Sequence, residues 1–491
     1  MNAGGWNSQS NSIEMRREQF LDLALFSVVL LVVGVLMRIF YPQPFVYSDS
    51  YTYIHAAAHN SFDFFRPNGY PHYLRLIHGV SPSLGFLFLV NYLFFALSSL
   101  LLLFTARQTL SIKNTPLFLA IGFCAILSPR LIFSTNYLMS DGTFCSLCAV
   151  FISSCLRLSG RPSWGWSIVN LLTLWLMCKL RYSGLFFIPA AAVAFYLSLR
   201  NKKKIIPILA ACLPVLLGAV FYVTTRTEYK KQSDVDVFSG FGGWQKINNA
   251  MVLFPEAKKL APVAFTPEVR NLHTFLTRQP DEKYDRSYTM GTLYMWSNEL
   301  PCKEYVFLMC SRLNAPYGNQ WVEQSKVFGE YANQLIAKYP FRYLNRYFLP
   351  SLWSTVRFMP FVEESIPVEE KDMLRPYYGV NYKTYNHRYR FFSGVVDPVR
   401  RVLNAVYWIA ALVSLLFFFY ALKKKYYSRT VGLGLLVLAL IFIFIIGGQA
   451  VSSPCTTWRY TMPFYQASVV FIFVNLWEMA RRLFGMTGRQ R

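Results

Sequence analysis

Long apolar runs recur along the chain, and they constrain its fold more than any other feature of the sequence. Ten of these runs have about the 17–25 residues with which an α-helix crosses the hydrocarbon core of a bilayer. They cover residues 21–40, 84–106, 116–133, 139–156, 164–180, 184–199, 205–224, 403–422, 431–450 and 463–480. Because a bilayer offers no water to the backbone, such runs fold as helices that satisfy their own hydrogen bonds. The sequence therefore predicts an all-α polytopic membrane protein with about ten transmembrane helices.

The composition argues against a soluble fold. Of the 491 residues, 54% are hydrophobic and 15% are charged, whereas a soluble domain has about 25% charged residues. Lys and Arg outnumber Asp and Glu by 49 to 25. A basic surplus is also typical of nucleic-acid binding, but here the positive residues flank the apolar runs, which is the pattern of membrane topology. We therefore expect no nucleic-acid partner.

The first apolar run, residues 21–40, is longer than the core of a signal peptide, which has about 7–15 residues. No small-residue cleavage site follows it. We expect an uncleaved first transmembrane helix.

The distribution of Lys and Arg predicts the orientation in the membrane. Residues 225–400 hold 23 of the 49, and the positive-inside rule concerns short loops, so this long segment is set aside. With both termini in the cytoplasm, 18 of the remaining 26 fall on the cytoplasmic side and eight on the other. Residues 41–83 and 225–400 are then exoplasmic. The sequence has no Asn-x-Ser/Thr sequon, which favours a bacterial inner (cell) membrane over an endoplasmic reticulum.

These boundaries divide the chain into three parts. Residues 1–224 form an N-terminal membrane module of about seven spans with a catalytic first exoplasmic loop at 41–83, and residues 401–491 form a C-terminal module of about three spans. Residues 225–400 form an exoplasmic or interfacial region. Within that region, 326–353 carry apolar side chains at helical spacing, which predicts one or two amphipathic helices on the exoplasmic leaflet. The apolar side chains are Phe328, Tyr331, Leu335, Phe341, Leu344 and Phe348.

The few acidic residues outside the long segment indicate where a polar site lies. Residues 225–400 hold 18 of the 25 Asp and Glu residues, which leaves seven. Four of these stand at cytoplasmic ends, whereas Asp49, Asp63 and Asp141 all map to the exoplasmic face. The eight basic residues on that face are Arg38, Arg66, Arg75, Arg130, Lys179, Arg181, Arg401 and Arg459. Charged groups at a membrane boundary are typical of a functional site.

Each of these residues also has a purely structural interpretation. Asp49 and Asp141 could complement the dipole at a helix N-terminus. Arg181 and Arg459 could be anchors that extend to the membrane surface.

The sequence has no clear metal-binding pattern. His55 and His59 are four residues apart but have no third ligand in a metal-type motif. Cys145 and Cys148 form a CxxC in an apolar run without histidine. A divalent metal is therefore not implied, and we expect no cofactor.

Five short stretches at the predicted exoplasmic ends carry a family resemblance. They are SDSYTYIHAA at 48–57, RPNGYP at 66–71, MSD at 139–141, LRYSGLFFIP at 180–189 and RYTMP at 459–463. Together and in this order they resemble the GT-C superfamily of polytopic glycosyltransferases that use polyprenyl-phosphate sugars. That superfamily includes protein O-mannosyltransferases (family 39-like) and the transferases that add aminoarabinose to lipid A. The acid pair of the first-loop motif is not matched, because Ser50 follows Asp49.

The resemblance implies a reaction that suits these residues. A sugar moves from a polyprenyl-phosphate donor to a hydroxyl of a glycan, lipid or protein acceptor, with inversion. Guanidinium groups stabilise the leaving phosphate, and a carboxylate takes the proton of the acceptor. The catalytic residue is then Asp49. The substrate-binding residues are Arg66, Tyr70, His72, Asp141, Lys179, Arg181, Arg459 and Tyr460.

Two other functions remain open at the level of sequence. A lipid-linked glycan ligase or polymerase would also use exoplasmic arginines, but it does not require the RPNGYP and MSD motifs together. A non-enzymatic lipid or glycan transporter would show charges near the middle of the bilayer or two repeated halves. The sequence has no internal repeat.

Overall fold

The computed structural model describes residues 4–280, 283, 300–357, 374–379, 389–452 and 458–485. Within these ranges the chain is helical apart from its loops and one isolated β-bridge, between Phe45 and Tyr137. The prediction of an all-α membrane protein is confirmed.

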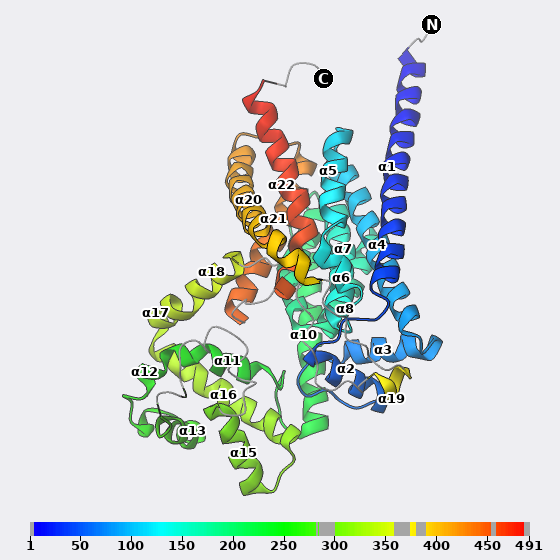
Figure 1. Ribbon diagram of the computed structural model, residues 1–491. Coiled ribbons are helices and arrows are strands. Elements are labelled where there is room, and N and C mark those ends of the chain that lie inside the picture. Colours follow the sequence, from blue (N-terminus) through cyan, green and yellow to red (C-terminus); the bar gives the residue numbers. More distant parts are fainter. Residues whose placement is uncertain are drawn as a thin grey trace.

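Every predicted span falls in a helical part of the structure (Figure 1), although two of them, 116–133 and 184–199, are each divided between two helical elements. In the part of the chain that the structure describes, six helices are long and apolar enough to cross a membrane. They are α1 (Gly4–Phe40) over residues 20–40, α4 (Leu84–Thr109), α7 (Ser140–Gly160), α10 (Ile205–Ser233), α20 (Tyr389–Lys423) over residues 402–423, and α21 (Arg429–Ser452). The other predicted spans fall on α5 (Thr115–Ile126), α8 (Trp164–Leu180), α9 (Ile188–Ser198) and α22 (Met462–Leu483). The protein is an integral membrane protein, and the number of crossings beyond these six stays a prediction.

The predicted span at 116–133 is wrong as a single helix. Helix α5 ends at Ile126, and a separate short helix, α6 (Pro129–Ser134), follows. Pro129 causes the break, because a proline cannot donate the helical hydrogen bond and forces the residue before it into an extended conformation. Ser128 has such a conformation, with φ −61° and ψ 114°.

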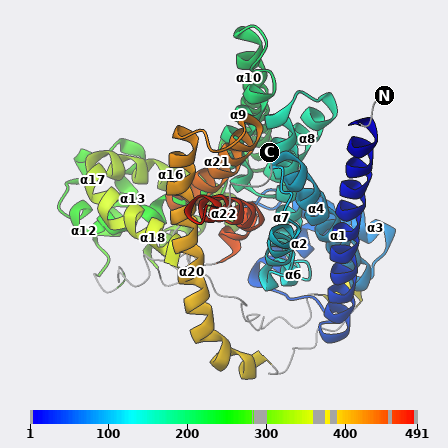
Figure 2. The same ribbon diagram turned by 90° about the horizontal axis from the view of Figure 1, so that it is seen from above.

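Helix α7 is the centre of the membrane bundle. It packs against α4, α8, α9, α21 and α22 (Figures 1 and 2). Of its most apolar 18-residue stretch 89% is buried, against 28% for α1, 22% for α10 and 17% for α20. Small residues such as Ser, Cys and Gly make up much of α7, and they let neighbouring helices approach closely. The three less buried helices lie at the edge of the bundle and present leucine, isoleucine and valine side chains outward.

A second hydrophobic core lies at one end of the bundle, beside α2 (Ser48–His59) and α3 (Gly69–Val80) (Figure 1). Helices α11 (Gly242–Ala250), α12 (Phe254–Ala257), α13 (Pro267–Thr277), α15 (Pro301–Leu313) and α16 (Tyr317–Lys338) build it. At its centre the rings of Trp244 and Trp321 stack 3.9 Å apart. Phe62, Phe64 and Phe65 of the first loop pack against this core, so the loop is held between the two cores.

The predicted amphipathic helices at 326–353 behave in two different ways. Phe328, Tyr331 and Leu335 lie on α16 and are fully buried in the second core, so the prediction that this face rests on a membrane is wrong. The pattern is real, but the apolar face meets protein. The continuation through α17 (Pro340–Tyr343) and α18 (Leu349–Arg357) exposes Phe341 and Trp353 by 80% and 65%, and membrane contact of that part stays a prediction.

The region 225–400 contacts both cores. Helix α10 continues past residue 224 to Ser233, and α19 (Arg375–Tyr378) packs on α3, where the rings of His78 and Tyr377 stack 4.0 Å apart.

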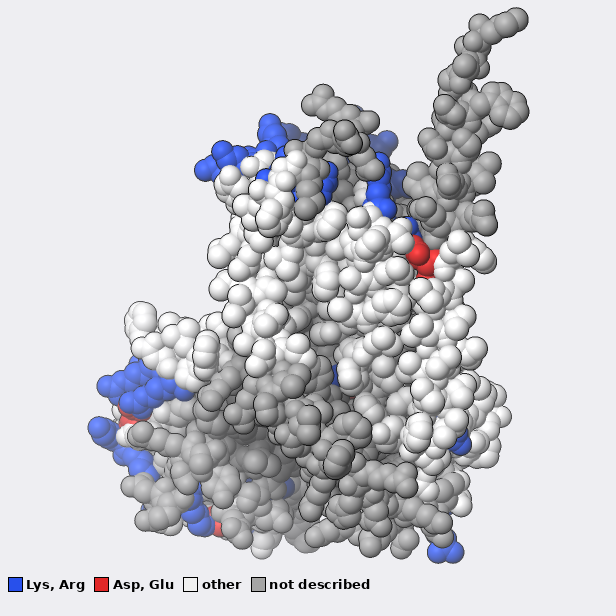
Figure 3. Space-filling view, turned by 45° about the horizontal axis from the view of Figure 1, so that its top comes forward, with Lys and Arg blue, Asp and Glu red and all other residues white. Residues whose placement is uncertain are grey.

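The two ends of the bundle differ in charge. On the face shown in Figure 3, Lys and Arg gather at the end where α22 finishes, and a belt with few charges separates them from those of the second core. The distribution of Lys and Arg along the sequence predicts that this end faces the cytoplasm.

Candidate active site

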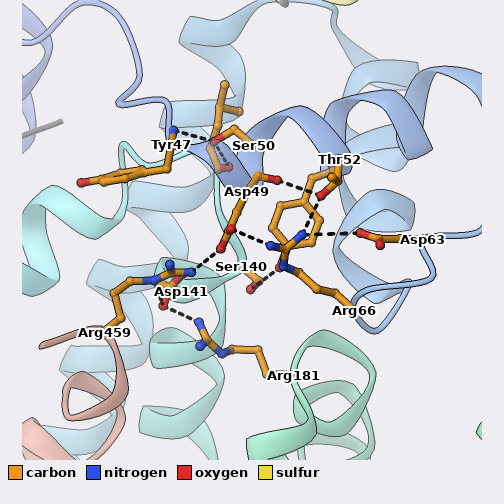
Figure 4. A network of polar contacts seen from close by, with 12 residues as sticks. Tyr47, Asp49, Ser50, Thr52, Asp63, Arg66, Ser140, Asp141, Arg181 and Arg459 are labelled. Atoms are coloured by element: carbon orange, nitrogen blue, oxygen red, sulfur yellow. Dashed lines mark hydrogen bonds and ion pairs between the residues drawn. The ribbon is translucent and has the colours of Figure 1, made fainter. Parts of the chain in front are cut away.

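Five charged side chains from distant parts of the sequence meet at the end of the bundle that adjoins the second core (Figure 4). Asp49 and Asp141 stand in the first turns of α2 and α7. Arg66 lies in the loop between α2 and α3, Arg181 follows α8, and Arg459 belongs to the short helix η7 (Trp458–Tyr460). All five were predicted from the sequence to belong to one site.

Arg459 is the bridge of this cluster. Its Nη2 donates to Asp49 Oδ2 at 3.0 Å and to Asp141 Oδ2 at 3.1 Å, and its Nε donates to Asp141 Oδ1 at 3.3 Å. Asp49 also accepts from Arg66 Nη2 at 2.6 Å, and Asp141 accepts from Arg181. The result is a continuous chain, Arg66–Asp49–Arg459–Asp141–Arg181. Three guanidinium groups against two carboxylates leave the cluster with a net positive charge.

Local contacts place the two aspartates beside each other. The segment before α2 is joined to the segment before α7, because Phe45 N donates to Asn136 O at 2.8 Å and Leu138 N donates to Phe45 O at 3.0 Å. Ser50 adds a second link. Its hydroxyl donates to Leu138 O at 2.8 Å and accepts from Tyr47 N at 3.0 Å.

These contacts explain why Ser50 stands where the family pattern has a second acid. Ser50 is fully buried. A carboxylate in its place could not donate to the carbonyl of Leu138 and would bury a charge against that oxygen. In this chain the position fixes the helix that carries Asp49, and it offers no second carboxylate to a metal.

A purely structural role, as helix-terminal acids or as arginine anchors at the membrane surface, does not account for the contacts of these residues. The N-cap of α2 is Tyr47 and that of α7 is Met139, so neither aspartate is a capping residue, and both carboxylates are bound by arginines. Arg181 and Arg459 are not anchors facing lipid, since their side chains are only 16% and 18% exposed and both are paired.

The arginines set the ionisation of Asp49. Burial alone would raise the pKa of this carboxyl, but Arg66 and Arg459 outweigh that effect and hold the pKa at about 2. Asp49 is therefore charged at every physiological pH. For Asp63 burial prevails over Arg66, and its pKa is raised.

Asp63 shapes the loop that carries Arg66. Its Oδ1 accepts from Phe65 N at 2.8 Å, and its own N donates to Asn68 Oδ1 at 2.7 Å. The nearest Arg66 nitrogen is 4.0 Å from Asp63 Oδ2. These bonds close the turn before Gly69. A Cβ there would stand 2.4 Å from the backbone oxygen of Lys179, so the turn fits against the end of α8 only with glycine.

Of the other predicted site residues, Tyr460 and Tyr70 lie close to the cluster. Tyr460 lies beside the cluster, with its ring centre 5.6 Å from the guanidinium carbon of Arg181. Tyr70 is fully buried and its ring centre lies 4.9 Å from that of Tyr53, against which Arg66 packs.

His72 and Lys179 are not brought into the cluster. His72 is exposed on α3. Lys179 lies 3.6 Å from Glu228 and packs over the ring of Trp175. Their part in substrate binding stays a prediction.

Three contributors were missed in the sequence. Arg66 Nη1 donates to Thr52 Oγ1 at 2.7 Å, and its guanidinium carbon lies 5.4 Å from the ring centre of Tyr53. The hydroxyls of Tyr53 and Ser140 are 3.3 Å apart. Thr52 and Tyr53 are three and four residues after Asp49, which places them on the same face of a helix, so this spacing was the available signal.

The described residues contain no group of three or more His, Cys, Asp and Glu side chains that could hold a metal ion. A cation between Asp49 and Asp141 would have to displace Arg459, which occupies that position. The cluster can instead bind an anion with its arginines and offer a carboxylate as a base.

Comparison with known proteins gives matches among solved structures only. No family model and no curated protein sequence matches the chain. The crystal structure of the Archaeoglobus fulgidus oligosaccharyltransferase in the apo form matches with a TM-score of 0.45 and 12% identity, covering 96% of this chain and 52% of that one. The A. fulgidus oligosaccharyltransferase AglB in complex with an inhibitory peptide and a dolichol-phosphate matches at 0.43, with the same identity and coverage.

A third match is ArnT from Cupriavidus metallidurans bound to undecaprenyl phosphate, with a TM-score of 0.29, 12% identity, and 87% and 77% of the two chains covered. The chain spans about half the length of the oligosaccharyltransferase chains it matches. Because every TM-score is below 0.5, the proposed function depends on the site and not on these likenesses.

Proposed function

We propose that the protein is an integral membrane glycosyltransferase that moves a sugar from a polyprenyl-phosphate donor to an acceptor hydroxyl. The observation that carries this proposal is the convergence of Arg66, Arg181 and Arg459 on two carboxylates at one end of a membrane bundle. An enzyme of this kind works at the exoplasmic face, here the periplasmic side of a bacterial inner membrane. The acceptor is a glycan, a lipid or a protein.

The position of the cluster suits a donor that is held by the bilayer. Helix α1 exposes Leu31, Val35 and Ile39 by 67%, 51% and 63%, as expected for side chains that face lipid. The chain passes from the end of α1 directly into the segment that carries Asp49. An isoprenoid tail lying along such helices would bring its phosphate to the level of the arginines.

The arginines suit a phosphate leaving group. A guanidinium has five N–H donors, so three of them offer about 15, whereas two carboxylates accept about eight hydrogen bonds. Donors therefore remain for the oxygens of a phosphate. Stabilisation by pre-positioned donors in a partly buried site is commonly the largest single contribution to such a reaction. The partial exposure of Arg66 and Arg459, 18% each, leaves an approach from outside.

Asp49 is the proposed general base. The acceptor oxygen attacks the anomeric carbon, and its proton passes to a carboxylate oxygen of Asp49. The bond from the anomeric carbon to the phosphate oxygen breaks with its electron pair on that oxygen, which releases polyprenyl phosphate. Attack opposite the phosphate inverts the anomeric centre.

Because the pKa of Asp49 is low, this carboxylate becomes an effective base only after the sugar donor has bound. While Arg66 and Arg459 both bind it, the carboxylate is a weak base. A donor phosphate that draws one of these arginines away would raise the pKa of Asp49 and free one of its oxygens. Under this proposal the base becomes effective when the donor is in place, which limits loss of the sugar to water.

The test is the consumption of defined donors. Membranes that contain the protein, and matched membranes without it, are incubated with polyprenyl-phosphate hexoses and pentoses and with the corresponding diphosphate-linked sugars. We expect release of polyprenyl phosphate from one monophosphate donor, together with one glycosylated species that disappears from cells lacking the protein. Consumption of diphosphate donors alone would indicate a ligase or polymerase. No consumption and an unchanged glycan profile would contradict enzymatic transfer.

A further inference from the structure

A cavity of about 310 Å³ opens at the end of the bundle opposite to the Asp49 cluster. It lies between the last turns of α4 and α7 and the start of α8. The residues that line it are Phe104, Gln108, Arg157, Arg161, Ser163 and Trp166. Arg157 is 17 residues along α7 from Ser140, which corresponds to about 26 Å at 1.5 Å per residue. The cavity is therefore separate from the candidate active site, and nothing in the proposed reaction uses it.

The cavity has an uncompensated positive charge. Its described lining includes two guanidinium groups and no carboxylate. No described acid pairs with Arg157 or Arg161. The Nε of Arg157 is buried without a hydrogen-bond partner, although its guanidinium carbon lies 5.5 Å and 5.9 Å from the ring centres of Phe104 and Trp166. A buried donor without an acceptor is costly, and the side chain that carries this donor lines the cavity.

Other arginines at the same end are compensated. Arg107 pairs with Asp22, and Arg481 and Arg482 pair with Glu478 at 3.2 Å and 2.8 Å. Arg200 has no described acid as a partner and its Nε is also buried without an acceptor, but its Nη1 donates to Ser159 O at 3.0 Å and to Leu197 O at 2.6 Å. Arg157 and Arg161 differ from these arginines because no described carboxylate or carbonyl oxygen accepts a hydrogen bond from them, so their N–H groups remain available to a ligand.

The start of α8 adds to the positive potential. Ser163 is the N-cap of this 17-residue helix and also lines the cavity. The first N–H groups of a helix and its dipole favour an anion at this end. Two arginines and a helix N-terminus around one cavity are together suited to a group with several negative oxygens, since guanidinium forks match phosphate geometry.

We propose that this cavity binds a phosphate-bearing anion at the membrane surface. Its volume is at the lower end of ligand pockets, which hold about 300–1,000 Å³, and a phosphate with a small attached group fits that size. Trp164 and Ile168 on the same part of α8 are 88% and 63% exposed, as expected for a flank in contact with lipid. The phosphate can come from a phospholipid head group or from a soluble anion. The inference does not depend on the proposed function.

The experiment measures binding to the purified full-length protein in two arms. In the first, native mass spectrometry counts retained phosphatidylglycerol, with diacylglycerol as the lipid that lacks phosphate. In the second, inorganic phosphate is titrated against Trp fluorescence. The variants are Arg157→Gln and Arg161→Gln. Lys203→Gln removes an exposed charge at the same end and is the matched control.

Each arginine variant should weaken binding by about tenfold or more, the loss expected from one charge-assisted hydrogen bond. The control should stay within about twofold of wild type. Binding in the lipid arm alone identifies a head group, binding of free phosphate alone identifies a soluble anion, and either supports the site. No saturable binding in either arm, or binding by Arg161→Gln equal to wild type, would overturn it. Arg161 is exposed, so this variant decides the question even if Arg157→Gln fails to fold.

Discussion

Replacement of Arg459 should have the largest effect of any arginine in the cluster. Its guanidinium makes three hydrogen bonds to two carboxylates, at 3.0, 3.1 and 3.3 Å, and among the described residues no other side chain is hydrogen-bonded to both Asp49 and Asp141. Arg459→Ala leaves Arg66 on Asp49 and Arg181 on Asp141, so the aspartates stay paired, but the bridge is lost. Removing one pre-positioned donor to developing negative charge costs about 10²–10³ in rate, and we expect at least that loss of transfer.

The variant Arg459→Lys distinguishes the effect of the positive charge at this position from the effect of the guanidinium geometry. A lysine keeps the positive charge but has a single ammonium at the end of a flexible chain, which cannot reproduce the planar fork of a guanidinium. We expect turnover between that of wild type and Arg459→Ala, with at least about a tenfold loss. A structural anchor that faced lipid would be replaced by lysine with little effect.

The assay measures the release of polyprenyl phosphate in membranes, divided by the amount of folded protein. That amount is determined by size-exclusion chromatography of the detergent-solubilised protein. Arg75→Ala is the matched control, because Arg75 is an exposed arginine at the same end whose side chain contacts Asn60 and not the cluster. It should turn over at a rate close to wild type. Combining Arg459→Ala with Asp141→Asn should cost less than the two changes summed, since both break one interaction. Turnover of Arg459→Ala within about threefold of wild type would refute this reasoning.

Three further predictions concern pH, packing and topology. Since the folded-state pKa of Asp49 is lowered from 3.8 to about 2, its stabilising contribution is complete above about pH 4 and is lost as the pH falls toward 2. The value of kcat/KM should therefore show no acid limb between about pH 5 and 7, and a limb near pH 6 would contradict this. Gly142→Ala should lower stability by about 1–3 kcal/mol, because its Cβ would meet a backbone oxygen at 2.3 Å, whereas Gly165→Ala has open space around it. Equal Tm values for the two would argue against the packing described. A cysteine at the exposed position Asp234 should label from outside and one at Ser428 should not, in a background without other exposed cysteines, and reversed labelling would invert the orientation.

The sequence predicted the fold well where apolar runs decide it. Eight of the ten runs lie on one helix each, and the runs 116–133 and 184–199 are each divided between two helical elements, because a bilayer leaves the backbone no alternative to helical hydrogen bonds. The sequence was less informative where the same pattern of apolar residues fits two different environments. An apolar stripe at helical spacing occurs on a helix that rests on lipid and on one that packs against protein, and for Phe328 and Tyr331 of α16 the partner is the second core.

The sequence predicted which residues form the site, but it did not predict which of them pair with each other. Charges that are rare in such a chain, at the ends of apolar runs on one side, were enough to bring together Asp49, Arg66, Asp141, Arg181 and Arg459. Which charges pair with each other depends on the loop between α2 and α3 and on the link from Ser50 to Leu138, which are long-range contacts. For the same reason Lys179 could not be distinguished from Arg181, two residues away, although it points toward Glu228.

The most direct test of the central claim is the turnover of Asp49→Asn. Asparagine has the size of aspartate and keeps one oxygen, which can accept from one of the two arginines, while its amide NH2 group faces the other. The amount of folded protein and the binding of donor are therefore measured beside turnover. Asparagine cannot take a proton, and general-base catalysis contributes about 10²–10⁴-fold. With normal amounts of folded protein and donor binding retained, we predict a loss of transfer of that size. Turnover close to wild type would contradict the claim that Asp49 is the base, and the role would pass to Asp63 or Asp141.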